Sequence, residues 1–148
     1  MKSSTRSGKI KIVLDTNIII SALLCSEGSS AKILEKIIAG EIESFTSSGI
    51  IEELREVLDR KEVKERVEKR ARFFLLENFY GLSEIVEPEG KIDVVREHKA
   101  DNKFIEVAVE AGAKYLVTGD RHLLKVGGFK SVNIVKPKRF LEILEGLV

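Results

Sequence analysis

The sequence predicts an α/β protein, built as a three-layer α/β/α sandwich with a parallel central sheet. Short segments rich in Val, Ile and Leu alternate along the chain with segments whose apolar residues recur at helical spacing. The strand-like segments are almost entirely apolar, as expected where helices cover both faces of a parallel sheet. With 148 residues, of which 43% are hydrophobic and 33% charged, the chain can bury one core and is too apolar for a disordered protein.

The elements are expected to follow one another in strand–helix order. Helical periodicity after the first strand stops at Gly40, and Gly112 closes a later helix. Ser47 and Ser48 can cap the next helix, and this helix is expected to follow the second strand and to run to about Arg60. The expected strands are residues 10–14, 42–46, 115–118 and 132–135, with short strand pieces at 85–86 and 94–95. The other expected helices are 18–24, 31–39, 62–79 (as one or two helices), 102–111, 121–125 and 137–144.

Composition excludes several classes of protein. With 25 basic and 24 acidic residues the net charge is +1, so a polyanion would have to be held locally or through metal ions. The single cysteine, Cys25, excludes a disulfide framework and a zinc site of several cysteines, and we expect it in the core, within an apolar helix. No apolar run reaches the ~18 residues of a membrane helix, and no signal peptide is visible.

We therefore expect a cytoplasmic protein without a membrane partner. The absence of Gln and the abundance of Lys, Arg and Glu are typical of a thermophile. Residues 1–8 are small, polar and basic and are expected to form a flexible arm, which leaves residues 9–148 as a single domain.

Four carboxylates are expected to meet at one edge of the sheet. Asp15 directly follows the first strand, and Asp120 follows strand 115–118 after one glycine. The carboxyl ends of parallel strands share an edge, where an open sheet forms its ligand crevice. Connecting helices run antiparallel to the strands, so Asp101, at the start of a helix, reaches the same edge. Glu53 lies in the first turns of the helix after the second strand and borders its apolar stripe.

Each acid also has a simpler explanation. Asp15, Asp101 and Asp120 stand where an aspartate can cap a helix, and Glu53 alone is typical of a solvated helix residue. Together, however, carboxylates crowded in an apolar crevice repel one another unless a cation offsets their charge. Oxygen ligands without clusters of Cys or His favour Mg²⁺ or Mn²⁺, ions that activate water and stabilise the leaving oxygen of a phosphodiester. The four acids are therefore candidate metal ligands and catalytic residues.

Other polar residues near these acids are candidates for supporting roles. Four of them could orient carboxylates or bind metal-held water: Asn17, Thr118, Thr16 and Ser21. Helix capping and loop hydrogen bonds are the alternative, and we favour it for Thr16 and Ser21. Basic side chains could contact RNA phosphates, although solvation is the more common role of a surface Lys or Arg. These basic residues are Arg96, Lys99, Lys103, Arg121 and Lys125.

Four segments resemble, in order and spacing, the successive signatures of PIN-domain nucleases: LDTNIIISALL, IIEELREVL, ADNKFIEVA and YLVTGDRHLL. The likeness runs from about Lys9 to Leu144 and is greatest to the prokaryotic toxin components of toxin–antitoxin pairs. It implies a Mg²⁺- or Mn²⁺-dependent endoribonuclease with the α/β/α sandwich, and an antitoxin among its partners. It assigns as the four acids Asp15, Glu53, Asp101 and Asp120, with Asn17 and Thr118 as their polar partners.

The chain departs from the family pattern beside two of these acids. Many members carry Asp and Pro shortly before the third acid, where this chain has Glu97 and His98. Many also carry an acid two residues after the fourth, where His122 stands. These departures concern the number and affinity of metal ions. The two histidines could shuttle protons, but no spacing requires it, and we expect them to be bystanders.

Other functions explain part of the pattern. A phosphate-accepting receiver domain has an acid after the first strand and a Lys-Pro after the last, here Lys136 and Pro137, but leaves Glu53 and Asp101 without a role. A haloacid-type phosphatase needs a second Asp where Asn17 stands. An RNA-processing nuclease outside toxin–antitoxin systems, or a non-catalytic RNA- or protein-binding module of the same fold, remains an alternative.

Segment 73–79, FFLLENF, holds more apolar residues than one core needs. It could form a homodimer interface, although burial in the core is the interpretation we favour.

The expected substrate is single-stranded or looped RNA, since its exposed backbone fits a crevice better than a duplex does.

Overall fold

The computed structural model describes residues 8–146. Its strands are β1 (Ile10–Leu14), β2 (Ile42–Thr46), β3 (Ser83–Ile85), β4 (Tyr115–Val117), β5 (Gly128–Phe129) and β6 (Val132–Val135). They form one sheet in the order β3-β2-β1-β4-β6-β5, in which β5 alone pairs antiparallel. Residues 1–7 of the expected arm lie outside the described residues, and Gly8 is exposed and belongs to no element. The domain boundary at residue 9 stays a prediction.

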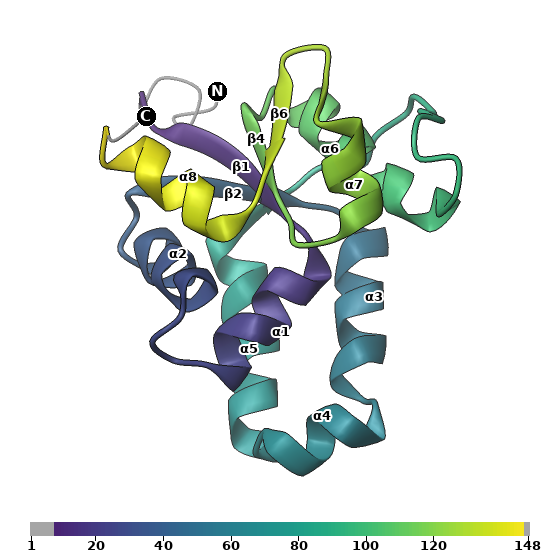
Figure 1. Cartoon of the computed structure of the whole chain (residues 1–148). Coiled ribbons are helices and arrows are strands. Elements are labelled where there is room, and N and C mark those ends of the chain that lie inside the picture. The colour runs from purple at the N-terminus through teal and green to yellow at the C-terminus, as the bar shows by residue number, and fades with distance from the viewer. Residues whose placement is uncertain (1–7, 147–148) are drawn as a thin grey trace.

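Helices cover both faces of the sheet, which confirms the three-layer sandwich (Figure 1). They are α1 (Thr16–Leu24), α2 (Ser29–Ile38), α3 (Ser48–Leu58), α4 (Lys61–Arg66), α5 (Lys69–Leu82), α6 (Asn102–Ala111), α7 (Arg121–Val126) and α8 (Pro137–Leu144), with a 3₁₀ turn, η2 (Lys99–Asp101). Ile12 and Leu14 of β1 face a core shared with α1, α2, α5 and α8, whereas Val13 faces α6 and α7. This alternation is expected of a strand that is buried on both sides. Among the described residues, no helix combines the length and apolar character needed to cross a membrane.

Most of the expected elements are confirmed. β1, β2, β6, α6 and α8 have the expected bounds, and segment 62–79 forms parts of two helices, α4 and α5, the second of which continues to Leu82. Ser47 caps α3, its hydroxyl accepting from the Ile50 N–H at 3.2 Å. Gly112 ends α6 in the left-handed conformation, with φ of 68°, that glycine adopts without strain.

The strand expected at residues 94–95 is wrong. No strand forms there, because the N–H groups of Val94 and Val95 donate to the side chain of Asn102 instead of to a neighbouring strand. The turn η2 and the strand β5 were not expected from the sequence. Both are too short for periodicity to indicate them, since β5 has two residues and η2 three.

Cys25 lies at the surface, contrary to expectation. Helix α1 ends at Leu24, and Cys25 adopts an extended backbone while its N–H donates to the Ser21 carbonyl oxygen at 3.0 Å. The helix therefore ends one residue before Cys25, and the cysteine side chain does not lie on its buried face.

Segment 73–79 is only partly buried in the core. Leu75 and Phe79 are 6% and 2% exposed, whereas Phe73 and Phe74 are 63% and 65% exposed. Successive residues of a helix point in different directions, so consecutive apolar residues cannot all face one core. Helix α5 therefore presents two aromatic rings to solvent.

Candidate functional site

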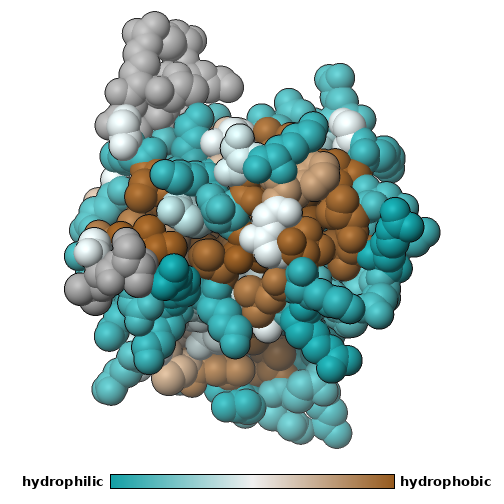
Figure 2. All heavy atoms as spheres, turned by 45° about the horizontal axis from the view of Figure 1, so that its top comes forward, coloured by the Kyte–Doolittle hydropathy of each residue, from teal (hydrophilic) through white to brown (hydrophobic). Residues whose placement is uncertain are grey.

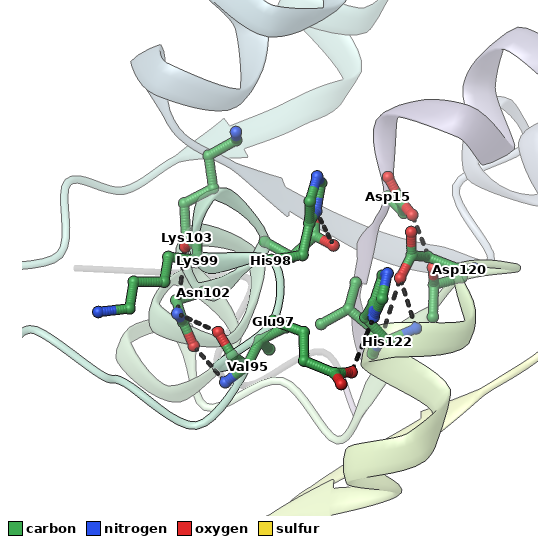
Figure 3. A network of polar contacts seen from close by, with 12 residues as sticks. Asp15, Val95, Glu97, His98, Lys99, Asn102, Lys103, Asp120 and His122 are labelled. Atoms are coloured by element: carbon green, nitrogen blue, oxygen red, sulfur yellow. Dashed lines mark hydrogen bonds and ion pairs between the residues drawn. The ribbon is translucent and has the colours of Figure 1, made fainter.

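Two of the predicted acids, Asp15 and Asp120, lie where the neighbouring strands β1 and β4 end. The pairing of Leu14 with Val117 sets the strand ends level, and the Asp15 N–H donates to the Val117 carbonyl oxygen at 3.0 Å. Thr118 links the two acids, because its hydroxyl donates to Asp15 Oδ2 at 2.6 Å and accepts from the Asp120 N–H at 2.9 Å. Figure 3 shows both carboxylates in this network. Thr118, which directly follows β4, thus contacts both acids.

Both acids also cap helices, as their simpler explanation predicts. Asp15 Oδ1 accepts from the Asn17 N–H at 3.3 Å. Asp120 Oδ1 accepts from the N–H groups of His122 at 2.7 Å and Leu123 at 3.2 Å. Capping does not exclude ligand binding, because both bonds to Asp120 use Oδ1 and leave Oδ2 available.

The third acid, Asp101, lies at the start of α6 but makes no capping bond from its side chain. Its Oδ2 instead lies 2.8 Å from His98 Nδ1. In a 3₁₀ turn, residues three apart stand over one another. Because η2 begins directly after His98, it places the imidazole against the Asp101 side chain, which is 10% exposed.

The segment before η2 is held by the buried side chain of Asn102. Its Oδ1 accepts from the N–H groups of Val94 at 3.0 Å and Val95 at 2.9 Å. Its Nδ2 donates to the carbonyl oxygens of Val95 at 3.2 Å and Lys99 at 3.1 Å. These four bonds use every donor and acceptor position of the amide. They fix the segment that carries His98 relative to α6 (Figure 3).

Glu53 lies on α3 and forms an ion pair with Lys103. The two side chains are 30% and 28% exposed, so Glu53 sits at the margin of the buried face, where the helical spacing placed it. Lys103, expected either to contact phosphate or to be solvated, pairs with this carboxylate instead. Glu53 is close enough to the other acids for its charge to raise the pKa values of Asp15 and Asp101.

Burial and mutual repulsion disfavour the ionised acids. Burial raises the pKa of Asp15, and neighbouring carboxylates raise it further, against the hydrogen bond from Thr118. Burial also raises the pKa of Asp101, and neighbouring carboxylates add to this effect, against the hydrogen bond with His98. A cation at this edge would favour the ionised forms of both acids.

The two histidines belong to this network, contrary to the expectation that they are bystanders. The rings of His98 and His122 stack with centroids 5.5 Å apart and planes 19° apart. His122 Nδ1 lies 3.4 Å from Glu97 Oε1, and the hydrogen bond with Asp101 raises the pKa of His98. The spacing His-x-x-Asp before a helix was the available signal, but its meaning depends on the unexpected turn η2.

The remaining predicted residues are more loosely connected to the acids. Thr16 is 1% exposed, and its hydroxyl has no hydrogen-bond partner among the described residues. Asn17 and Ser21 are exposed, and within residues 8–146 neither side chain bonds a carboxylate. The exposed basic residues are Arg96, Lys99, Arg121 and Lys125. A hollow of 320 Å³ beside the histidines is lined in part by Arg96, Glu97, His122 and Lys125.

Another hollow, of 460 Å³, lies at the opposite edge of the sheet, where β4 and β6 begin. Its lining includes Lys114, Lys130 and Val132 but none of the predicted site residues. Figure 2 brings the top of Figure 1 forward and shows hydrophobic residues across the middle of that face and hydrophilic residues around it.

The residues at the carboxylate edge fit a divalent cation. One nitrogen of His98 and one oxygen each of Asp101 and Asp120 lie within 4.8 Å of one another. Asp15 joins this group through Thr118. Carboxylate oxygens are preferred ligands of Mg²⁺ and Mn²⁺, and buried acids that repel one another are stabilised by such an ion.

Known proteins share this architecture. The solved structures with a similar fold include PAE2754 from Pyrobaculum aerophilum, with 19% identity and a TM-score of 0.64 over 95% of this chain and 94% of that one. They also include VapBC2 from Rickettsia felis, bound to a DNA fragment from their promoter, with 18% identity and a TM-score of 0.58 over 84% and 97%. VapC20 from Mycobacterium tuberculosis, a Sarcin-Ricin loop cleaving toxin, is 15% identical with a TM-score of 0.50 over 82% and 98%.

Sequence comparison identifies the family. The chain is 32% identical over 149 residues to the uncharacterized protein MJ1680 of Methanocaldococcus jannaschii, and the match covers 95% of each chain. The PIN-domain profile matches residues 11–122, which contain all four predicted acids. The chain therefore belongs to the PIN-domain nuclease family.

Proposed function

We propose that this protein is a metal-dependent endoribonuclease that hydrolyses phosphodiester bonds of single-stranded or looped RNA. The observation that carries the proposal is the gathering of Asp101 and Asp120 at one edge of the sheet, with Asp15 joined to them through Thr118 and Glu53 near enough to raise the pKa values of Asp15 and Asp101. When bound, a Mg²⁺ or Mn²⁺ ion supplies an activated water and stabilises the leaving oxygen of the phosphodiester.

The side chains of such a site have different roles. Asp15, Asp101 and Asp120 hold the ion, and Glu53 completes the acidic set. Thr118 orients Asp15 through its 2.6 Å hydrogen bond. Arg96 and Lys125, which line the hollow of 320 Å³, provide phosphate contacts together with Arg121, which lines an adjacent hollow. A net charge of +1 is compatible with RNA binding, since a bound ion would add positive charge at the carboxylate edge.

Cleavage of a mixed RNA pool tests the proposal. The wild type should cleave with Mn²⁺ and stop with EDTA, and Asp15→Asn and Asp101→Asn should be inactive. Asp59→Asn is the matched control, because it removes a carboxylate that is 76% exposed and paired with Lys64 on the surface. Equal cleavage by all variants would contradict the proposal. RNA binding that survives Asp15→Asn, without cleavage by the wild type, would favour a non-catalytic binding module.

We further propose that the protein is the toxin of a toxin–antitoxin pair. VapBC2 and VapC20, whose folds are similar, support this role, as does an apolar face that suits a protein partner. On that face Ile38 and Phe74 are 55% and 65% exposed. They border a groove of 190 Å³ between α2 and α5, which Leu34 and Leu82 also line.

Expression in a bacterial host separates the toxin from an RNA-processing nuclease. A toxin should arrest growth, and co-expression of the product of a small neighbouring gene should restore it. Phe74→Ala should weaken this rescue without lowering RNA cleavage. Normal growth with active enzyme would favour RNA processing. A sedimentation measurement that gives a dimer, lost in Phe74→Ala, would assign the face to a second copy of the chain instead.

A further inference from the structure

We propose that His98 is a nitrogen ligand of the divalent metal, and that it makes this site favour first-row transition ions such as Mn²⁺ over Mg²⁺. This inference rests on the proposed function, because it deepens the description of the same metal site. It concerns a residue that the sequence indicated to be a bystander and that stands where many members of the family carry another residue.

The positions of the ligand atoms carry the inference. His98 Nδ1 lies 2.8 Å from Asp101 Oδ2, and a ligand atom of Asp120 lies within 4.8 Å of both residues' ligand atoms. Neighbouring ligands of an octahedral ion with bonds of about 2.1 Å are about 3 Å apart. The imidazole and the carboxylate therefore already stand at a spacing that two adjacent ligands of one ion would have.

The backbone holds His98 in this position before any ligand arrives. The turn η2 places residue 98 above residue 101, and the Asp101 N–H donates to the His98 carbonyl oxygen at 3.0 Å. Asn102 fixes the approach to this turn with its four hydrogen bonds. A ligand that is positioned in this way loses little conformational entropy when it binds an ion.

A second ring supports the imidazole. The His98 ring stacks on His122 at 5.5 Å, and His122 is itself held by Glu97 at 3.4 Å and by its N–H bond to Asp120 at 2.7 Å. Glu97, His98 and His122 are the residues by which this chain departs from the family pattern. Here they form one connected group beside the acids (Figure 3).

The ligand type sets the preference among ions. Mg²⁺ strongly prefers oxygen ligands and retains several waters, whereas first-row transition ions accept an imidazole nitrogen more readily than Mg²⁺ does. Exchanging a carboxylate or water for the His98 nitrogen should thus weaken Mg²⁺ relative to Mn²⁺. The alternative role for His98 is a hydrogen-bond donor that only orients Asp101.

Electron spin-echo spectroscopy of bound Mn²⁺ distinguishes these roles without measuring activity. The chain has two histidines, so ¹⁵N-histidine labelling leaves two candidates for a directly bound imidazole. The wild type should show strong nitrogen coupling, and His98→Gln should lose it. His122→Phe is the matched control, since it keeps a ring beside His98 but removes the other imidazole, and it should retain the coupling.

Metal titration gives the second measurement. In His98→Gln the affinity for Mn²⁺ should fall by about tenfold or more, and the affinity for Mg²⁺ should fall much less. Binding of Mn²⁺ to the wild type without nitrogen coupling would overturn the role of His98 and leave the proposed nuclease intact. Coupling that persists in His98→Gln would also overturn it. A wild type that binds neither ion would overturn both the inference and the proposed metal-dependent function.

Discussion

The carboxylate edge of the sheet and the apolar face of α2 and α5 depart from ordinary packing in opposite ways. At the edge, Asp15 and Asp101 are 4% and 7% exposed, although each carries a charge when ionised. On the helical face, Ile38 and Phe74 are 55% and 65% exposed. Burying charge and exposing large apolar side chains are both unfavourable for an isolated chain. The comparison predicts that a bound cation would stabilise the first region and an apolar protein surface the second.

The largest expected effect is on RNA cleavage and comes from a substitution at the carboxylate edge. Asp101→Asn should lower metal-dependent RNA cleavage by more than about a hundredfold, because a ligand of the ion is lost while the fold keeps an isosteric side chain. Initial rates with saturating Mn²⁺ give the measurement. A rate within about a factor of two of the wild type would place the metal elsewhere.

Helix α5 allows the apolar side of the comparison to be tested within one element. Phe79→Ala should lower the free energy of unfolding by about 3–5 kcal/mol, since Phe79 is 2% exposed. Phe74→Ala should change it by less than about 0.5 kcal/mol, as for an exposed residue. Urea unfolding measures both. A large loss in Phe74→Ala would show that its ring belongs to the core and does not serve a partner.

Asn102→Ala should lower the free energy of unfolding by about 1–3 kcal/mol, because it leaves the N–H groups of Val94 and Val95 at the carboxylate edge without their acceptor. Asn133→Ala is the control, because Asn133 is exposed and makes one side-chain bond, to Lys114 at 3.4 Å. Similar unfolding free energies for both variants would mean that the segment before η2 is not held by Asn102.

The smallest expected effect has the opposite sign. Burial and repulsion raise the pKa of Asp15, so its charge destabilises the folded protein at neutral pH without metal. Asp15→Asn should therefore raise the melting temperature in EDTA, and Asp59→Asn should not. A lower melting temperature for Asp15→Asn would mean that its capping and Thr118 bonds outweigh the repulsion.

The sequence predicted most of the fold because the elements that matter are long and periodic. β1, β2, α6 and α8 combine apolar patterns with clear boundaries such as Gly112 and Pro137. The short elements escaped prediction, since η2 and β5 offer too few residues for a pattern. The strand expected at 94–95 shows a further difficulty, because the backbone N–H groups there bond to the side chain of Asn102 and not to a neighbouring strand.

The acids of the candidate site could be located from topology alone. Asp15, Asp101 and Asp120 each stand at a strand end or helix start, and parallel strands bring these ends together. The pairing of Glu53 with Lys103, across 50 positions of sequence, could not be foreseen. The place of His98 could not be foreseen either, because it depends on a 3₁₀ turn where the pattern indicated only the start of an α-helix.

The stability of the protein as a function of Mn²⁺ concentration tests most directly whether a cation balances the buried carboxylates. The melting temperature of the wild type should rise steadily with Mn²⁺ above the dissociation constant, and that of Asp101→Asn should stay nearly constant. An equal rise in both proteins, or no rise in the wild type, would contradict the account.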